Sequence, residues 1–252
     1  MNPTALITGA TSGLGAEFAR QLAADGHNLV LVARDAARLD QRAHELSAAY
    51  PVRVEILTAD LLTDEGGAAL ARRLDDDTDP VTVLVNNAGF GLPGWFTENT
   101  LDAERDHLRI LVQAPMELAH TAITAFTRRR GGRVINVAST AGFTPRGTYS
   151  AAKAWMINFS RWANVHYAAS GVQVTAVCPG FVRTEFHARM NADTSGIKDW
   201  MWLTPDRVVR EGLRDAAAGK AVSIPTKRYK ALTAISRALP AGAARKLAAR
   251  GR

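Results

Sequence analysis

The segment Thr8-Gly9-Ala10-Thr11-Ser12-Gly13-Leu14-Gly15 decides the fold of this chain. It follows a short apolar run at 5–7 and precedes a helical pattern over 16–24. A strand, a glycine-rich turn and a helix in this order let backbone N–H groups at the helix N-terminus bind a phosphate. The segment predicts a dinucleotide site, and the alternative is a plain strand-to-helix turn. Its spacing, Gly-x-x-x-Gly-x-Gly, leaves the decision to later motifs.

Strand-like and helix-like stretches alternate along the rest of the chain. Apolar runs typical of buried parallel strands lie at 5–7, 28–33, 53–58, 82–86, 133–137 and 173–177, with a seventh candidate at 221–224. Helical patterns lie between them at 36–49, 67–74, 102–129 and 151–170. This alternation predicts the α/β class with one doubly wound parallel sheet. Ligands of such sheets bind beyond the carboxyl ends of the strands, which is where catalytic residues are expected.

The charge of the chain is concentrated at its end. The formal net charge is +7, but the stretch from Lys220 onward holds nine Lys or Arg and no acid, so residues 1–219 carry −2. We therefore expect a catalytic domain over 1–225, a basic and partly helical tail over 226–252, and no nucleic-acid partner. The tail is amphipathic, with Leu232, Ile235 and Leu239 on one face. It is expected to pack on the body or on another subunit, and a weak membrane-surface contact is the alternative.

Other bulk features narrow the location and chemistry. The chain starts its first strand almost at once, no apolar run is long enough to cross a bilayer, and Cys178 is the only cysteine. These features predict a reducing, cytoplasmic location without a disulfide. The six histidines form no metal-ligand spacing, so no metal site is expected.

Two acidic or basic strand ends indicate how a nucleotide is recognised. Arg34 follows the second strand, nineteen residues after Gly15. An acid at this place binds a ribose 2′-hydroxyl, whereas arginine pairs with a 2′-phosphate, so Arg34 predicts NADP(H) with NAD(H) as the lesser alternative. The adjacent Asp35 could exchange roles with it, and a solvated arginine is the plain alternative. Asp60 and Leu61, after the third strand, suit the adenine edge.

Polar residues at the next strand ends indicate proton chemistry. Asn87-Ala88-Gly89 follows the fourth strand, and Ser139 follows the fifth. Tyr149 and Lys153 then lie four residues apart, on one face of a helix. A nearby ammonium favours the phenolate, so the pair is expected to lower the tyrosine pKa and to exchange a proton with a carbonyl or alcohol.

Taken together, these motifs resemble the short-chain dehydrogenase/reductase family over residues 3–186. The resemblance rests on Thr8-Gly9-x-x-x-Gly13-x-Gly15, Asn86-Asn87-Ala88-Gly89, Ser139, Tyr149-x-x-x-Lys153 and Pro179-Gly180. It implies a Rossmann-like domain, hydride transfer between NAD(P)(H) and a carbonyl or alcohol, and Ser139, Tyr149 and Lys153 as catalytic residues. It also implies cofactor binding by Gly9, Thr11, Ser12, Gly13, Leu14, Gly15, Arg34, Asp60, Leu61, Asn87, Ala88, Gly89, Tyr149, Lys153, Pro179, Gly180, Val182 and Thr184.

Two departures from the family pattern leave a second function open. Leu111 stands where the family places an asparagine that helps to retain a water. The interval from Ser139 to Tyr149 is also shorter than usual, which leaves open a displaced serine, with Thr140 as its substitute, or a wider cleft. These features favour the alternative of a cofactor-binding but catalytically silent sensor or scaffold, whereas the intact Tyr149-x-x-x-Lys153 favours an enzyme.

Beyond Thr184 the sequence gives weaker guidance. Residues 185–203 fall where the family places a lid over the substrate, and they carry Phe186, Met190, Trp200, Met201 and Trp202. Such a lid is typical of a small-molecule apolar substrate, and ordinary core packing is the alternative for each residue. His187 lies near the expected cleft. The resemblance implies a homodimer or homotetramer formed through the helices around 102–129 and 150–170.

Overall fold

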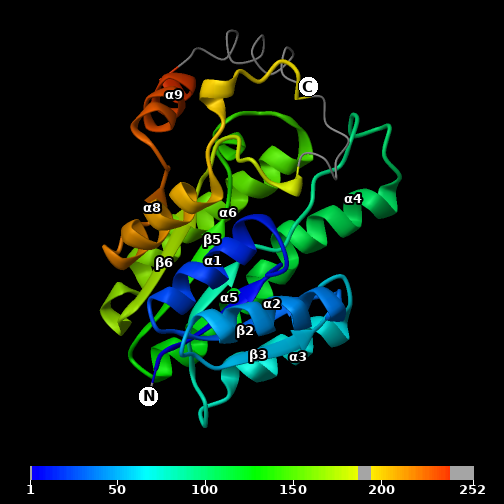
Figure 1. The fold of residues 1–252 in the computed structure, drawn as a ribbon. Helices are drawn as coiled ribbons and strands as arrows, with labels where there is room; N and C mark the ends of the chain where they lie inside the picture. The colour runs from blue at the N-terminus through cyan, green and yellow to red at the C-terminus, as the bar shows by residue number, and fades with distance from the viewer. Residues whose placement is uncertain (1, 187–193, 239–252) are drawn as a thin grey trace.

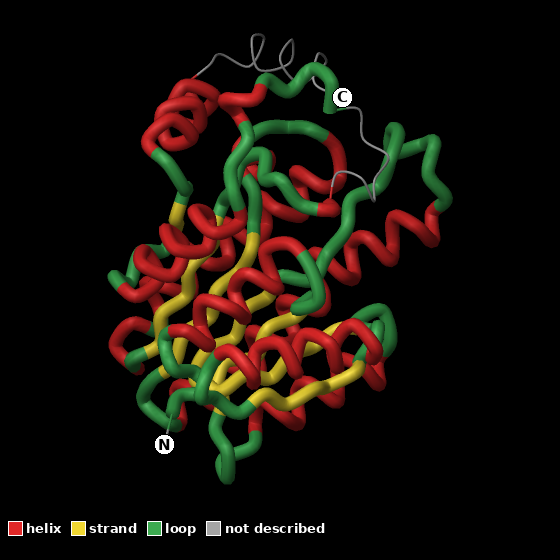
Figure 2. Tube along the Cα trace, in the orientation of Figure 1, coloured by secondary structure: helices red, strands yellow, loops and turns green. Residues whose placement is uncertain are grey.

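The computed structural model describes residues 2–186 and 194–238, which form a seven-stranded parallel sheet with helices on both faces (Figures 1 and 2). The strands stand in the order β3-β2-β1-β4-β5-β6-β7. Their bounds are β1 Thr4–Thr8, β2 Asn28–Ala33, β3 Val54–Thr58, β4 Val81–Asn86, β5 Gly132–Val137, β6 Val172–Val177 and β7 Val222–Ser223. The predicted class is confirmed, and β7 confirms the seventh candidate strand.

Two apolar layers hold the sheet. On one face, α1 (Gly13–Ala24), α2 (Ala36–Ala49) and α8 (Pro205–Ala217) bury side chains such as Phe18 and Leu39 against the strands. On the other face, α3 (Asp64–Asp75), α5 (Ala114–Arg128) and α6 (Gly147–His166) bury Leu70, Phe126 and their neighbours. Because both faces are covered, the central strands are largely apolar, which explains why the sequence shows them as apolar runs.

The helix predicted over 102–129 is interrupted. The chain forms α4 (Leu101–Leu108), then a π-helical turn over Arg109–Gln113, and then α5. A π turn adds one residue to a helical turn, so a run of helix-forming residues does not reveal it, and such turns often lie at functional sites. Leu111 lies in this turn with its side chain buried, and a Cβ on Gly89 would come within 2.7 Å of it.

The segment predicted as a tail begins with a helix that contacts the body. In α9 (Lys227–Ala238) the ring of Tyr229 is 5% exposed, and its hydroxyl accepts a hydrogen bond from Phe181 N–H and donates one to the Met201 carbonyl. Leu232 and Ile235 are 37% and 59% exposed, so their apolar face has no cover within the described chain. Leu239 lies outside the described residues.

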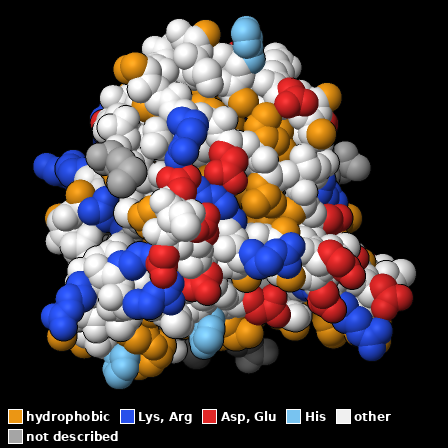
Figure 3. All heavy atoms as spheres, turned by 90° about the horizontal axis from the view of Figure 1, so that it is seen from below, with side chains coloured by type: hydrophobic (Ala, Val, Ile, Leu, Met, Phe, Trp, Pro, Cys, Tyr) orange, Lys and Arg blue, Asp and Glu red, His pale blue; other side chains and the backbone are white. Residues whose placement is uncertain are grey.

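The surface carries both signs of charge. On the face that Figure 3 shows, Lys and Arg side chains lie among Asp and Glu side chains rather than in one large patch. Arg128 and Arg129, for example, both pair with Asp77. Among the described residues, no helix combines the length and the apolar character that crossing a membrane requires.

The contact between Gly180 and Tyr229 generates a testable prediction. A Cβ on Gly180 would lie 1.9 Å from Cζ of the Tyr229 ring, so Gly180→Ala must displace the ring and its two hydrogen bonds. We expect a loss of about 1–3 kcal/mol in the free energy of unfolding, measured by urea denaturation. Gly131→Ala, which meets no atom within 4 Å, is the matched control. Equal stability of the two variants would contradict the contact.

Candidate active site

The glycine-rich turn is built by close backbone contacts at the carboxyl end of β1. Gly9 has a φ of +68°, which favours glycine, and a Cβ there would lie 2.9 Å from Nδ2 of Asn87. A Cβ on Gly15 would lie 2.1 Å from the Gly9 carbonyl oxygen. Thr11 and Ser12 complete the turn, with Ser12 at the N-cap position of α1, followed by Leu14 in the first helical turn. The turn is therefore a tightly packed loop whose helix N-terminus points beyond the sheet.

Thr8 connects this turn to the Asn87-Ala88-Gly89 segment that follows β4. Its Oγ1 accepts hydrogen bonds from Asn87 N–H and Ala88 N–H, at 2.9 and 3.0 Å, and donates one to the Val85 carbonyl. The side-chain amide of Asn87 donates back to the Thr8 carbonyl at 2.9 Å. The two motifs lie on neighbouring strands at the point where the strand order reverses, as expected for a doubly wound sheet.

The loop after β6 closes the site from the other side. Pro179 accepts a hydrogen bond from Thr140 N–H, and Gly180 packs on Tyr229. Val182 is 5% exposed and pairs with Leu203 in an isolated bridge. A Cβ on Gly13 would lie 3.3 Å from Cβ of Thr184, so this loop reaches the glycine-rich turn.

The serine and the tyrosine lie together despite their short interval. A single turn of 3-10 helix over Thr140–Phe143 follows Ser139, and α6 then starts at Gly147, two residues before Tyr149. The hydroxyl of Ser139 lies near that of Tyr149 and lowers the pKa of the phenol in part. The compact 3-10 turn takes up the missing residues and leaves Ser139 near Tyr149.

Lys153 is buried beside the tyrosine. Its Nζ donates a 2.7 Å hydrogen bond to the Val137 carbonyl at the end of β5 and lies 5.6 Å from the centre of the Tyr149 ring. Burial lowers the pKa of Lys153 to about 8, because a charged ammonium loses its hydration in the protein interior. The amine can therefore hold or release a proton near neutral pH.

The pKa of Tyr149 moves opposite to the sequence expectation. Burial raises it to about 12, and the Ser139 hydroxyl opposes that rise only in part. Desolvation dominates because the phenol is packed among other side chains, although partly exposed, and the lysine amine is bonded to a backbone carbonyl. The expected lowering by the ammonium is thus wrong for this structure, and the phenol stays protonated throughout the neutral range.

A chain of buried amides fixes the helix that carries these residues. Asn86 Nδ2 donates to Oδ1 of Asn136 at 2.9 Å, and Asn136 Nδ2 donates to the Ser160 hydroxyl at 2.9 Å. Ser160 in turn donates to the Met156 carbonyl. This chain joins β4 and β5 to α6, so it sets the position of Tyr149 and Lys153 relative to the sheet.

His107 is a site residue that the motifs did not indicate. Its ring is 2% exposed and stacks on the Tyr149 ring, with 6.2 Å between centres and 20° between planes. Phe90 and Phe186 lie beside the same two rings. The available signal was its spacing, since a residue four before Leu111 lies on the same side of an ordinary helix.

The predicted nucleotide contacts lie at the ends of β2 and β3. The Arg34 side chain is 68% exposed, and its Nη1 lies 4.0 Å from Oδ2 of Asp60. Asp35 accepts a hydrogen bond from Arg38 N–H and caps α2, which gives it a structural role in place of the exchange with Arg34. Leu61 is 7% exposed and packs in the core, so only its backbone can meet a ligand.

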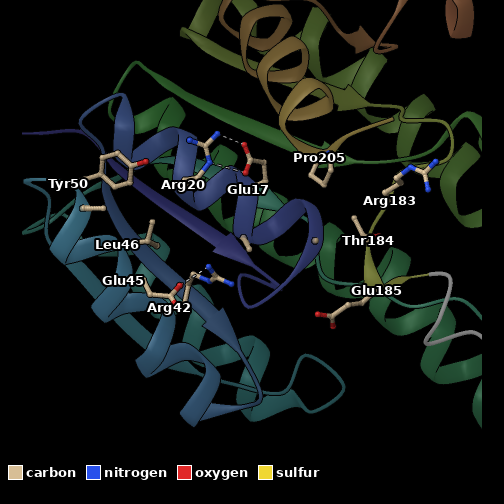
Figure 4. Close-up of a pocket in the computed structure, with 13 residues that line it drawn as sticks. Glu17, Arg20, Arg42, Glu45, Leu46, Tyr50, Arg183, Thr184, Glu185 and Pro205 are labelled. Carbon is tan, nitrogen blue, oxygen red and sulfur yellow. Dashed lines mark hydrogen bonds and ion pairs between the residues drawn. The ribbon is translucent and has the colours of Figure 1, made fainter. Parts of the chain in front are cut away.

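A cavity of about 460 Å³ lies outside the group formed by Ser139, Tyr149 and Lys153 (Figure 4). It runs between α1, α2 and the loop at Thr184, and none of those three residues lines it. Its charged residues neutralise one another, since Arg20 pairs with Glu17 and Arg42 with Glu45. We therefore place the chemistry at the strand ends and not in this cavity.

Part of the expected lid is described. Phe186 lies 6.0 Å from the Tyr149 ring, Trp200 is half exposed, and Trp202 packs on Phe181. His187 and Met190 lie outside the described residues. Within residues 2–186 and 194–238, no cluster of His, Cys, Asp and Glu could hold a metal ion.

Comparisons with known proteins agree with this geometry. A family profile described as short chain dehydrogenase matches residues 3–195. A short-chain dehydrogenase from Sphingobium yanoikuyae in complex with NADPH is 34% identical, with a TM-score of 0.85 over 99% of this chain and 96% of that chain. The bulky-bulky ketone specific alcohol dehydrogenase from Comamonas testosteroni is 31% identical, with a TM-score of 0.80 over 99% and 95%.

Curated relatives include two with contrasting names. Galactitol 2-dehydrogenase (L-tagatose-forming) from Cereibacter sphaeroides is 30% identical over 89% of each chain. The human inactive hydroxysteroid dehydrogenase-like protein 1 is 29% identical over 80% of this chain, which spans 61% of that relative's length. Because the family profile covers most of the chain and the motifs meet at one edge of the sheet, this chain belongs to the short-chain dehydrogenase family.

Proposed function

We propose that this protein is an NADP(H)-dependent oxidoreductase that interconverts a carbonyl and an alcohol on an apolar substrate. One observation carries the proposal: Ser139, Tyr149 and Lys153 meet at the strand ends, next to the glycine-rich turn. The names of the relatives support it, since one is a structure with NADPH and another is specific for bulky ketones. The nearness of Ser139 to Tyr149 also supports it over the silent alternative.

The residues at the strand ends fit a dinucleotide. The first N–H groups of α1 have no acceptor within the helix, and they suit a pyrophosphate. Arg34 is mostly exposed and only loosely paired with Asp60, so it suits a 2′-phosphate. The Pro179-Gly180 loop, with Val182 and Thr184, suits the nicotinamide side. When bound, this cofactor supplies or accepts the hydride.

The side chains of the site handle the proton. In the direction of reduction the Tyr149 hydroxyl donates its proton to the substrate oxygen, and Ser139 hydrogen-bonds the same oxygen. A phenol with a raised pKa remains protonated at neutral pH, which favours this donor role. Lys153 lies beside the ring and, with a pKa of about 8, can hold or release a proton next to the phenolate that remains. In oxidation the same groups act in reverse.

Aromatic rings around the tyrosine favour an apolar substrate. His107 and Phe186 lie against the Tyr149 ring and Phe90 lies against His107, and such surfaces bind apolar ligands with few polar contacts. The lid that carries Trp200 and Trp202 supports the same substrate class.

The proposal includes a homo-oligomer in the cytoplasm. Exposed apolar side chains on the described helices α5 and α6, such as Met116, Trp162 and Val165, would be covered by a second copy of the chain. A weak membrane-surface contact through the exposed side of α9 is the alternative role for Leu232 and Ile235.

Turnover by a Tyr149→Phe variant tests the proposed reaction. Loss of the proton donor should lower the rate of NADPH oxidation with bulky ketones by about 10²–10⁴-fold, because general acid catalysis contributes that much. Absorbance of NADPH measures the rate, and calorimetry checks that NADPH still binds. Tyr167→Phe is the control, because Tyr167 caps the C-terminus of α6, the helix that carries Tyr149. Binding of NADPH without turnover by the wild type over a broad ketone panel would favour the silent alternative.

Arg34→Ala tests the cofactor preference. Removing a charge-assisted pair with the 2′-phosphate should weaken NADPH binding by about 1.5–3 kcal/mol and leave NADH binding nearly unchanged. Arg42→Ala is the matched control, since Arg42 pairs with Glu45 on α2. Calorimetric titration with both cofactors gives the difference. Equal losses for NADPH and NADH would exclude the 2′-phosphate role.

A further inference from the structure

His107 is a buried titratable group that the proposed reaction does not yet use. Its Nε2 is buried and has no hydrogen-bond partner among the described residues. Burial lowers the pKa of His107, the negative charge of Glu104 raises it, and the charge of Lys153 lowers it again. A buried polar atom without a partner is costly, so its place beside the reacting phenol calls for a function.

Polar groups continue from His107 toward the surface. Nδ1 of His107 lies 3.9 Å from Oε2 of Glu104, which is 8% exposed. The other carboxylate oxygen, Oε1, accepts a 3.0 Å hydrogen bond from Nδ2 of Asn99, which is only partly buried. Asn99 belongs to a loop in which Trp95 and Phe96 are more than half exposed. The order is therefore surface, Asn99, Glu104, His107, Tyr149.

We propose that His107 and Glu104 form a proton relay that returns a proton from solvent to the partly buried Tyr149 beside the buried Lys153. The inference rests on the proposed function. Histidine suits this role because it takes a proton at one ring nitrogen and releases one from the other near neutral pH. Its two nitrogens already differ in their surroundings, because Nδ1 lies 3.9 Å from Glu104 whereas Nε2 is buried without a hydrogen-bond partner among the described residues.

During reduction the relay replaces the proton that Tyr149 gives to the substrate. Donation to the substrate oxygen breaks the O–H bond of Tyr149 and leaves a phenolate. Glu104 passes a solvent proton to Nδ1 of His107, and Nε2 releases one toward the phenolate through a bridging water. Tyr149 regains its O–H bond, and Glu104 returns to its starting state. His107 is left as its other neutral tautomer, with the proton on Nδ1 instead of Nε2, and exchange of the ring protons through water restores the Nε2–H form before the next turnover. In oxidation the proton leaves by the same path.

The charges that face His107 come from two helices. Glu104 lies on its own helix, α4, while Tyr149 and Lys153 lie on α6. The coupling is reciprocal, so the pKa of His107 should report the charge of both neighbours.

An NMR titration of the histidine ring tests this coupling in the cofactor-free protein. Relative to the wild type, Lys153→Met should raise the pKa of His107 and Glu104→Gln should lower it. His107→Ala assigns the signal. A pKa that neither substitution moves would overturn the relay, whether or not the protein has turnover.

Kinetics test the relay once the wild type shows turnover with a ketone. His107→Ala should lower kcat by about tenfold or more with little change in KM, and added imidazole should restore the rate. Phe90→Leu alters the same ring cluster without a titratable group, so its rate should not respond to imidazole. An unchanged kcat in His107→Ala, or a loss that imidazole does not restore, would overturn the relay. Absence of wild-type turnover would instead refute the proposed reaction.

Discussion

The structure depends on one costly arrangement, an amine buried beside a phenol at the end of a parallel strand. Lys153 has lost its water and keeps one strong hydrogen bond, to the Val137 carbonyl. Its pKa falls to about 8 while that of Tyr149 rises to about 12, both because burial disfavours the charged form. The protonation equilibria of both groups are therefore shifted toward the uncharged form. Small changes in nearby charge can shift a proton between the site and solvent.

The surrounding fold keeps this arrangement in place. The amide chain from Asn86 through Asn136 to Ser160 joins α6 to two strands, and the Tyr229 ring packs on Gly180 in the loop opposite. These contacts are made by residues that do not touch a substrate oxygen. They explain why the motif includes Asn86, whose side chain serves the helix rather than the cofactor.

The sequence was sufficient for the parts of the molecule that local rules determine. Apolar runs located the seven strands of the described chain, and local capping rules account for the start of α8, where Thr204 accepts a hydrogen bond from Arg207 N–H and Pro205 is the first helical residue. Features that depend on contacts between residues distant in the sequence could not be predicted from it. The π turn at Leu111, the 3-10 turn that brings Ser139 to Tyr149, the burial of His107 and the seat of Tyr229 on Gly180 are all settled by tertiary packing. The direction of the Tyr149 pKa shift could not be predicted for the same reason, since desolvation is a property of the folded environment.

The most direct measurement compares the pH dependence of stability in the wild type and in Lys153→Met. A folded-state pKa of about 8 against 10.5 in the unfolded chain means that the unfolded state binds more protons between these values. The wild type should therefore gain up to about 3 kcal/mol relative to the variant as pH rises from 8 to 10.5, as measured by urea unfolding. The raised pKa of Tyr149 acts above pH 10 in both proteins and cancels in the difference. A difference that does not change with pH would contradict a dry, charge-disfavouring site around Lys153.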